Sequence, residues 1–301
     1  NPVGHRSAQM YRSHGKSYLL EEKIYRTRPL GGQWGEVDVR GQNYVTKQTA
    51  FLGQQFRNAR EFMVNRMMHG SFDMLKVGDD WMPTVAGDGN SFTVDFGIPA
   101  GNKSQLNMTG GGSIIDRSWA DPKANISKHC LAINAAFEQN HGYPLRHAWC
   151  NSNMLNNLFS NTDLINKGGI ANVMFTDYTP MPQPSPEGIA NTGFLVRFKG
   201  IPWLTWHVTD MGLDVQTSSS GTTFTKFWGD TEVGFYPEPS NEIAEMAEGS
   251  EPVAENVIDP ATERFGMTAW TERCTQPAGF ELIGLDNALP MVYIPKAIAS
   301  G

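Results

Sequence analysis

The sequence predicts an α+β fold, and three observations support this prediction. Residues 43–69 have the residue spacing of one long helix. Several later segments alternate apolar and polar residues, which is the pattern of half-buried strands. The chain shows no repeated alternation of strand and helix, which argues against doubly wound sheets and α/β barrels.

The length and the low charge content set the next limits. A chain of 301 residues can form one large domain or two medium ones. Charged residues make up only 18% of it, below the roughly 25% of typical soluble domains. A monomer needs charge on its outside, so this shortfall predicts that much of the surface faces other protein. No apolar run approaches the roughly 18–20 residues of a membrane span, so we expect no membrane partner.

The charges are unevenly distributed along the chain. The net charge is −7, which argues against binding nucleic acid through bulk electrostatics. Residues 1–66 nevertheless hold eleven Lys and Arg against five Asp and Glu, whereas residues 229–265 hold ten acidic residues and only Arg264 as a cation. Across a contact between subunits, this asymmetry would provide complementary charge.

The helix over residues 43–69 carries the clearest periodicity. Its apolar residues recur at steps of three and four, among them Tyr44, Phe51, Phe56 and Phe62. His69 stands where the last turn would favour positive charge, and Gly70 is a natural C-cap. At about 1.5 Å per residue this helix would be roughly 40 Å long.

The other elements are predicted from shorter patterns. Asp121-Pro122 resembles a capped helix start, and further helices are expected at residues 153–159 and 241–247. Strands are expected at residues 17–20, 23–25, 92–96, 146–149, 193–198, 203–208, 231–236, 265–270, 280–285 and 291–294. Residues 1–30 have too little apolar content for a core of their own and are expected to form an arm or hairpin that rests on something else.

Candidate catalytic and metal-binding residues are few. His129, Cys130, His147 and Cys150 are the best metal-like cluster, but their spacing fits no standard zinc pattern. We expect buried cysteines and capping or surface histidines there instead, with no metal and no cofactor. His207 in a predicted strand could act as a base, although a lone strand histidine is usually structural. The sequence therefore favours a structural or binding protein over an enzyme.

Four segments, taken in order, resemble the lambda-type major capsid protein E family of tailed bacteriophages. They are the basic residues 1–30, the helix ending Met67-Met68-His69-Gly70, the strand Phe92-Thr93-Val94-Asp95-Phe96-Gly97, and the stretch Ser118-Trp119-Ala120-Asp121-Pro122 before a helix. The closing segment Gln276-Pro277-Ala278-Gly279-Phe280 is also similar. The shared order of these segments carries the resemblance.

The resemblance implies the Hong Kong 97-type capsid fold, with an extended loop, a long spine helix, a peripheral domain and an axial domain. It places the extended loop at residues 1–30, the peripheral domain at 31–125 with its spine helix at 43–69, the axial domain at 126–262, and the return to the peripheral domain at 263–301. The basic residues of the loop would contact acidic surface of a neighbouring subunit; they are Arg12, Lys16, Lys23, Arg26 and Arg28.

The implied function is that of a major capsid protein. Copies would self-assemble into hexamers and pentamers and form the icosahedral head shell around double-stranded DNA. The implied partners are copies of the chain, a decoration protein, a scaffold and a portal, with DNA contacted only non-specifically. The protein would belong to the virion and assemble in the host cytoplasm. The family's N-terminal arm precedes the extended loop, so we expect that arm to be removed or to lie outside this sequence.

Three alternatives remain open at the level of sequence. An encapsulin-like nanocompartment would share the architecture but enclose a cargo enzyme. A metal-dependent hydrolase would use the His and Cys cluster and would hold a stoichiometric metal. A carbohydrate-binding module is suggested by the eight tryptophans, but the long helix argues against it.

Overall fold

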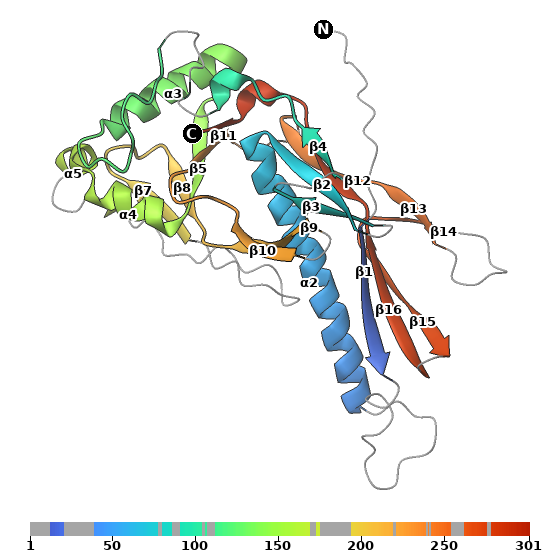
Figure 1. The fold of residues 1–301 in the computed structure, drawn as a ribbon. Helices are drawn as coiled ribbons and strands as arrows, with labels where there is room; N and C mark the ends of the chain where they lie inside the picture. The colour runs from blue at the N-terminus through green and yellow to red at the C-terminus, as the bar shows by residue number, and fades with distance from the viewer. Residues whose placement is uncertain are drawn as a thin grey trace, which may run out of the picture. The chain divides into compact units, whose positions relative to one another are not determined.

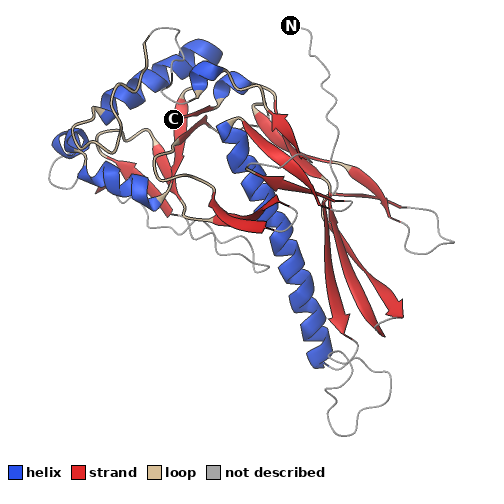
Figure 2. Cartoon of the chain, in the orientation of Figure 1, coloured by secondary structure: helices blue, strands red, loops and turns tan. Residues whose placement is uncertain are grey.

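A computed structural model describes residues 13–20, 39–77, 80–85, 91–103, 106, 112–168, 173–174, 194–218, 221–238, 240, 242–253, 262–275 and 278–301. Helices and strands are mixed along the chain, as the α+β prediction requires (Figure 2). The α-helices of the described residues are α2 (Val39–His69), α3 (Ile126–His141), α4 (Ser152–Ser160) and α5 (Thr162–Gly168), and short 3₁₀ helices lie at Ala100–Asn102 and Pro295–Ala297. In the described part of the chain, no helix is both long and apolar enough to cross a membrane.

Most of the strands are labelled in Figure 1. They are β1 (Ser13–Leu20), β2 (Ser71–Val77), β3 (Asp80–Thr84), β4 (Ser91–Asp95), β5 (Leu145–Cys150), β6 (Val173–Met174), β7 (Phe194–Phe198), β8 (Thr205–Val208), β9 (Gly212–Ser218), β10 (Gly221–Lys226), β11 (Gly234–Pro237), β12 (Ala244–Glu248), β13 (Ser250–Val253), β14 (Thr262–Phe265), β15 (Thr268–Thr275), β16 (Ala278–Asp286), β17 (Ala288–Val292) and β18 (Ala299–Ser300).

The chain divides into two compact units. Unit 1 comprises residues 1–61, 76–82 and 246–289, and unit 2 comprises residues 62–75, 83–245 and 290–301. Both units therefore draw on distant parts of the sequence. The domain bounds implied by the resemblance assign roles in a shell, and they stay a prediction.

Unit 1 is built on a three-stranded antiparallel sheet in the order β1-β16-β15. The first part of α2 packs on this sheet, and Leu19, Leu52, Phe56 and Leu282 form the buried cluster between them. Strand β1 pairs along its whole length with β16 of the same chain. Residues 13–20, for which the sequence predicts no core of their own, therefore rest on a strand of the same chain, and the contact of residues 1–30 with a neighbouring subunit stays a prediction.

Unit 2 is built on a six-stranded sheet in the order β18-β11-β5-β8-β7-β6. All described neighbours run antiparallel except β5 and β8, which are parallel. Alternate residues of β5, β8 and β11 face the large buried cluster of this unit, for example Ala148, Trp206 and Phe235. Helices α3 and α4 cover the same face through Ile133, Phe137 and Leu158, side chains that are fully buried.

The structure confirms most of the expected elements but shifts several bounds. The long helix begins at Val39, four residues before the expected start, and ends at His69 as expected. Gly70 follows with φ +97°, and its N–H donates to the carbonyl of Arg66. This left-handed C-cap is the reason for glycine at this position. The expected strand at residues 23–25 lies outside the described residues.

Two predicted helix signals were wrong. Residues 244–248 form strand β12, paired with β17, although Ala, Glu and Met favour helices. Pairing with another strand overrides that local preference. Helix α3 begins at Ile126, not directly after Asp121-Pro122. The Asp121 carboxylate instead accepts a hydrogen bond from the Lys123 N–H and closes a turn before the helix.

We predict that Phe56→Asp prevents unit 1 from folding. Phe56 is 7% exposed between α2 and the sheet, and a buried carboxylate without a partner is costly enough to exceed the stability of a typical domain. The matched control is Phe51→Asp on the same helix, where the side chain is 58% exposed. Circular dichroism and limited proteolysis should separate the two variants. A folded Phe56→Asp protein would contradict the role assigned to this cluster.

Candidate functional site

The contact between α2 and the sheet of unit 1 depends on a glycine. A Cβ atom at Gly284 would lie 2.5 Å from Cδ2 of Leu52 and 2.7 Å from Cε2 of Phe56. Both distances are far below van der Waals contact. Strand β16 approaches the helix closely because this position has no side chain.

A charged network anchors the same helix beyond the apolar cluster. The Arg60 guanidinium donates from Nε to Oδ2 of Asp286 at 2.9 Å and from Nη2 to Oδ1 at 2.6 Å. A third donor, Nη1, contacts Oε1 of Glu248 at 2.6 Å. Asp286 is 5% exposed, so its charge is buried and depends on Arg60. The hydrogen bond to Asp286 is the main reason that the pKa of Arg60 is raised.

The predicted assembly residues fall largely outside the described part of the chain. Lys16 lies on β1, opposite Ile283 of β16. The other four, Arg12, Lys23, Arg26 and Arg28, lie outside the described residues. The structure therefore leaves their contact with a neighbouring subunit a prediction.

The four residues of the metal-like cluster have separate roles. Cys130 and Cys150 are fully buried, and burial raises the pKa of both thiols, which stay protonated at neutral pH. His129 is held by Trp119 and Asp116, and His147 pairs with His207. Over the residues that the structure describes, no three His, Cys, Asp or Glu side chains gather as a metal site would require.

His129 connects a buried indole to an exposed carboxylate. Nε1 of Trp119 lies 3.0 Å from Nδ1 of His129, and Nε2 of His129 lies 2.9 Å from Oδ1 of Asp116. An indole N–H can only donate, so Nδ1 accepts and Nε2 carries the proton that is donated to Asp116. These bonds fix the orientation of Trp119 and of the loop before α3.

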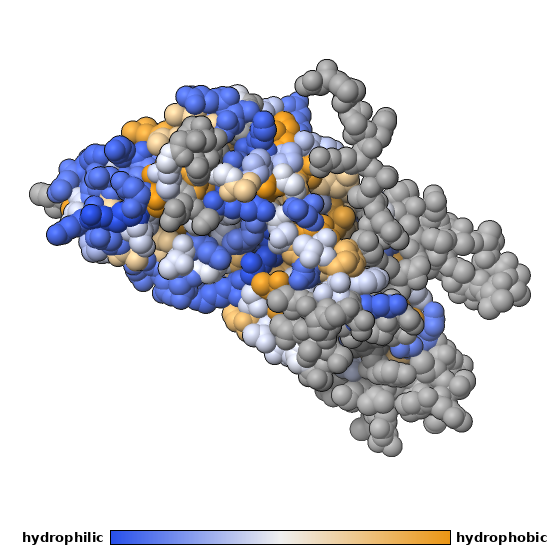
Figure 3. Space-filling model, turned by 45° about the horizontal axis from the view of Figure 1, so that its top comes forward, coloured by the Kyte–Doolittle hydropathy of each residue, from blue (hydrophilic) through white to orange (hydrophobic). Residues whose placement is uncertain are grey.

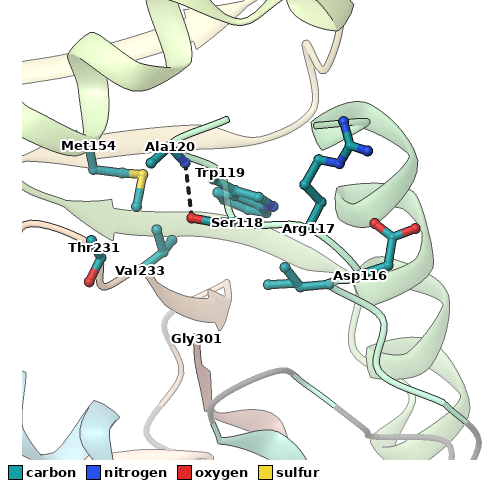
Figure 4. A pocket seen from close by; sticks show the side chains of 10 residues that line it. Asp116, Arg117, Ser118, Trp119, Ala120, Met154, Thr231, Val233 and Gly301 are labelled. Carbon is teal, nitrogen blue, oxygen red and sulfur yellow. Dashed lines mark hydrogen bonds between the residues drawn. The ribbon is translucent and has the colours of Figure 1, made fainter. Parts of the chain in front are cut away.

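Trp119 forms one wall of a pocket in unit 2 with a volume of about 300 Å³. Ile115, Met154 and Val233 supply further apolar surface, while Asp116 and Arg117 lie at the opposite side (Figure 4). The side chains of Asp116 and Arg117 are 71% and 51% exposed. The pocket therefore combines an apolar interior with an accessible pair of opposite charges.

The His147–His207 pair lies on the six-stranded sheet of unit 2, on the face opposite to the core residues Ala148 and Trp206. Nδ1 of His147 is 2.8 Å from Nε2 of His207, and the His207 ring stacks on Trp149 with the ring centroids 4.4 Å apart. Burial lowers the pKa of both histidines, that of His207 to about 4, and His147 adds to the shift in His207. At neutral pH both rings are uncharged, and they serve as a packed pair rather than as a charged site.

The comparisons with known proteins identify the class of protein. Residues 9–301 match the family described as phage major capsid protein E, so the chain belongs to this family. No curated protein matches the chain significantly. Among solved structures, one assigned as a prophage capsid protein of E. coli CFT073 is 15% identical, with a TM-score of 0.56 over 97% of this chain and 76% of that one.

Two further structures resemble the chain more loosely. A phage-related protein from Bordetella bronchiseptica RB50 is 10% identical with a TM-score of 0.45, over 97% of this chain and 73% of that chain. The capsid structure of cyanophage P-SCSP1u is 10% identical with a TM-score of 0.40, over all of this chain and 77% of that one. The family match and the first structure confirm the α+β capsid fold and a shell-forming role in the virion capsid.

The sequence prediction missed the buried charge network, the pocket and the histidine pair. One signal for the network was present, since Asp286 is the one charged residue in the largely apolar stretch from Leu282 to Leu289. A buried aspartate in such a run requires a cation, but nothing local indicates that the cation is Arg60, 226 residues away.

We predict that Arg60→Ala lowers the free energy of unfolding by about 3–5 kcal/mol, because Asp286 would stay buried without its partner. Lys47→Ala, at an exposed position of the same helix, should change it by no more than about 0.5 kcal/mol. Urea denaturation of the dissociated subunit would measure both. Equal effects of the two substitutions would contradict the proposed anchor.

We predict a second effect from the pKa of His207. The pKa of a histidine is near 6.5 in the unfolded chain and about 4 at His207 in the folded protein. Between these pH values the unfolded state therefore binds more protons than the folded state does, and acid favours unfolding. Stability is therefore present above about pH 6.5 and declines toward pH 4, by about 3 kcal/mol for this residue. His207→Gln should reduce the loss measured by denaturation at pH 7 and pH 4.5. An unchanged pH dependence would contradict this assignment.

Proposed function

We propose that the chain is the major capsid protein of a tailed bacteriophage, and that its copies form hexamers and pentamers of an icosahedral head shell around double-stranded DNA. The family match over residues 9–301 is the observation that carries this proposal. Within that family the protein is a structural component and not an enzyme. A scaffold, a portal and a decoration protein are proposed as further partners, and assembly is proposed to occur in the host cytoplasm.

The charge of the chain supports this proposal. A net charge of −7 disfavours strong binding of DNA to the inner wall, and strong binding would hinder packaging and ejection. A closed shell forms through many repeated contacts around symmetry axes, and each contact can be weak. The low proportion of charged residues fits a subunit that covers much of its surface with copies of itself.

We also propose that the segments of the chain have the structural roles that the resemblance implies. Residues 1–30 would reach a neighbouring subunit, residues 31–125 and 263–301 would build the peripheral domain, and residues 126–262 would lie near the centre of each capsomer. Pairing of β1 with β16 supports one refinement, because it ties residues 13–20 to the chain's own sheet. The basic residues after β1 would then make the contact with the neighbour.

The first experiment is negative-stain electron microscopy of the purified chain. We expect closed shells of uniform diameter, or capsomers that convert into shells. The variant Lys23→Glu, Arg26→Glu and Arg28→Glu should stay folded but form no closed shells, because the acidic surface of the neighbour would now meet like charge.

A matched control carries the same change in charge at exposed positions elsewhere. Lys123, Lys128 and Lys199 are all exposed, and replacing the three by Glu should leave assembly intact. If both triple variants form shells, the assignment of the basic segment fails. If the unmodified chain stays monomeric at all concentrations, the proposed function fails.

A further inference from the structure

An exposed aromatic ring stands on the two-stranded sheet of unit 2. Strands β9 and β10 pair only with each other among the described strands, and Phe224 of β10 is 58% exposed. Val215 of β9 is buried, so one face of this hairpin packs inward. Phe224 and its partner Asp214 belong to the other face, because side chains alternate along a strand.

The ring of Phe224 is held in place by a glycine. A Cβ atom at Gly212 would lie 2.7 Å from Cζ of Phe224 and would also overlap the carbonyl oxygen of Thr225. The ring therefore covers the bare backbone of Gly212, an arrangement that stabilises glycine in a sheet. A large apolar side chain that is both exposed and fixed loses little entropy when a partner covers it.

Charges of both signs flank this ring. Asp214 lies directly opposite Phe224 in the register, and Lys226 follows two positions later on the same face of β10. Lys226 contacts Asp230 at 3.2 Å, yet its side chain is still 39% exposed. Other exposed apolar residues are scattered, and one face of the surface shows them as separate patches among hydrophilic residues (Figure 3).

The pocket beside Trp119 has the complementary properties. Its volume of about 300 Å³ exceeds the roughly 150 Å³ in which a benzene molecule fits, so the space is large enough for a phenyl ring. Met154 and Val233 line its apolar part, away from the charged pair Asp116 and Arg117 (Figure 4). Asp116 and Arg117 present the charges that would match Lys226 and Asp214.

We propose that the Phe224 ring of one copy inserts into the Trp119 pocket of a second copy of this chain. The exposure of Phe224 means that it does not fill the pocket of its own chain. Asp116 of the second copy then faces Lys226, and Arg117 faces Asp214. Opposite charges meet in this way in only one relative orientation of the two copies. An aromatic anchor in a pocket with a charged rim is the usual form of an interface hot spot. This inference rests on the proposed function, which requires contacts between copies.

The test uses two variants of the full chain that each add one cysteine, Phe224→Cys and Thr231→Cys, where Thr231 is an exposed residue that lines the pocket. Mixed and assembled together under mild oxidation, they should give a cross-linked band of two chains. Either variant alone, and the parent chain with its three cysteines, should give no such band. Leu131→Cys, 57% exposed on α3, replaces Phe224→Cys as the matched control and should not cross-link.

A second measurement follows assembly by light scattering. Phe224→Ala should raise the concentration needed for assembly about 30-fold, the factor that corresponds to a 2 kcal/mol hot spot. Asp214→Arg and Arg117→Asp should each impair assembly about tenfold, and the double variant should recover it. Thermal melts verify that each variant is folded.

The outcomes separate this inference from the proposed function. Shells without the cross-link, together with normal assembly of Phe224→Ala, would overturn the contact and leave the function standing. A specific cross-link in oligomers that never close into shells would support the contact and overturn the function. If the double variant with Asp214→Arg and Arg117→Asp does not regain assembly, the proposed pairing of Arg117 with Asp214 is wrong.

Discussion

The close approach of strand β16 to helix α2 is the constraint on which unit 1 depends. Gly284 removes the side chain that would keep the two apart, and Leu52 and Phe56 occupy the space. Apolar contacts of this kind can slide along a helix, because they have no direction. The bidentate hydrogen bonds from Arg60 to Asp286 do have direction, and they fix the position of helix α2 along strand β16.

Unit 2 has a rigid surface feature, the pocket beside Trp119, in a chain with few charged residues. Its core is large and apolar, and a hydrogen bond from Trp119 to His129 fixes the orientation of both side chains at its edge. His129 orients Trp119 through one ring nitrogen and holds Asp116 through the other. A pocket wall made of such side chains is rigid before any partner arrives, so little conformational entropy is lost on contact. Many copies can then associate through small and specific contacts.

Local patterns predicted most of the elements, and their failures have a common cause. The long helix, strand β4 and helix α4 follow from periodicity, since each has a more covered and a more exposed side. Residues 244–248 consist of good helix formers, yet they pair with β17 as a strand. Asp121-Pro122 has the residues of a helix start, yet it closes a turn. In both places a contact with a distant or following segment outweighed a preference of a few tenths of a kcal/mol per residue.

The sequence by itself determined the α+β class, the long helix with its glycine cap, and the order of segments that identifies the capsid family. These features depend on neighbouring residues or on the order of segments along the chain, so they can be recognised without knowledge of the tertiary contacts. The tertiary structure alone decided the pairing of Arg60 with Asp286, the pairing of β1 with β16, and the pocket that Trp119 shares with Met154 and Val233. Each joins residues far apart in the chain, and spacing along a sequence contains no information on which distant side chains will meet.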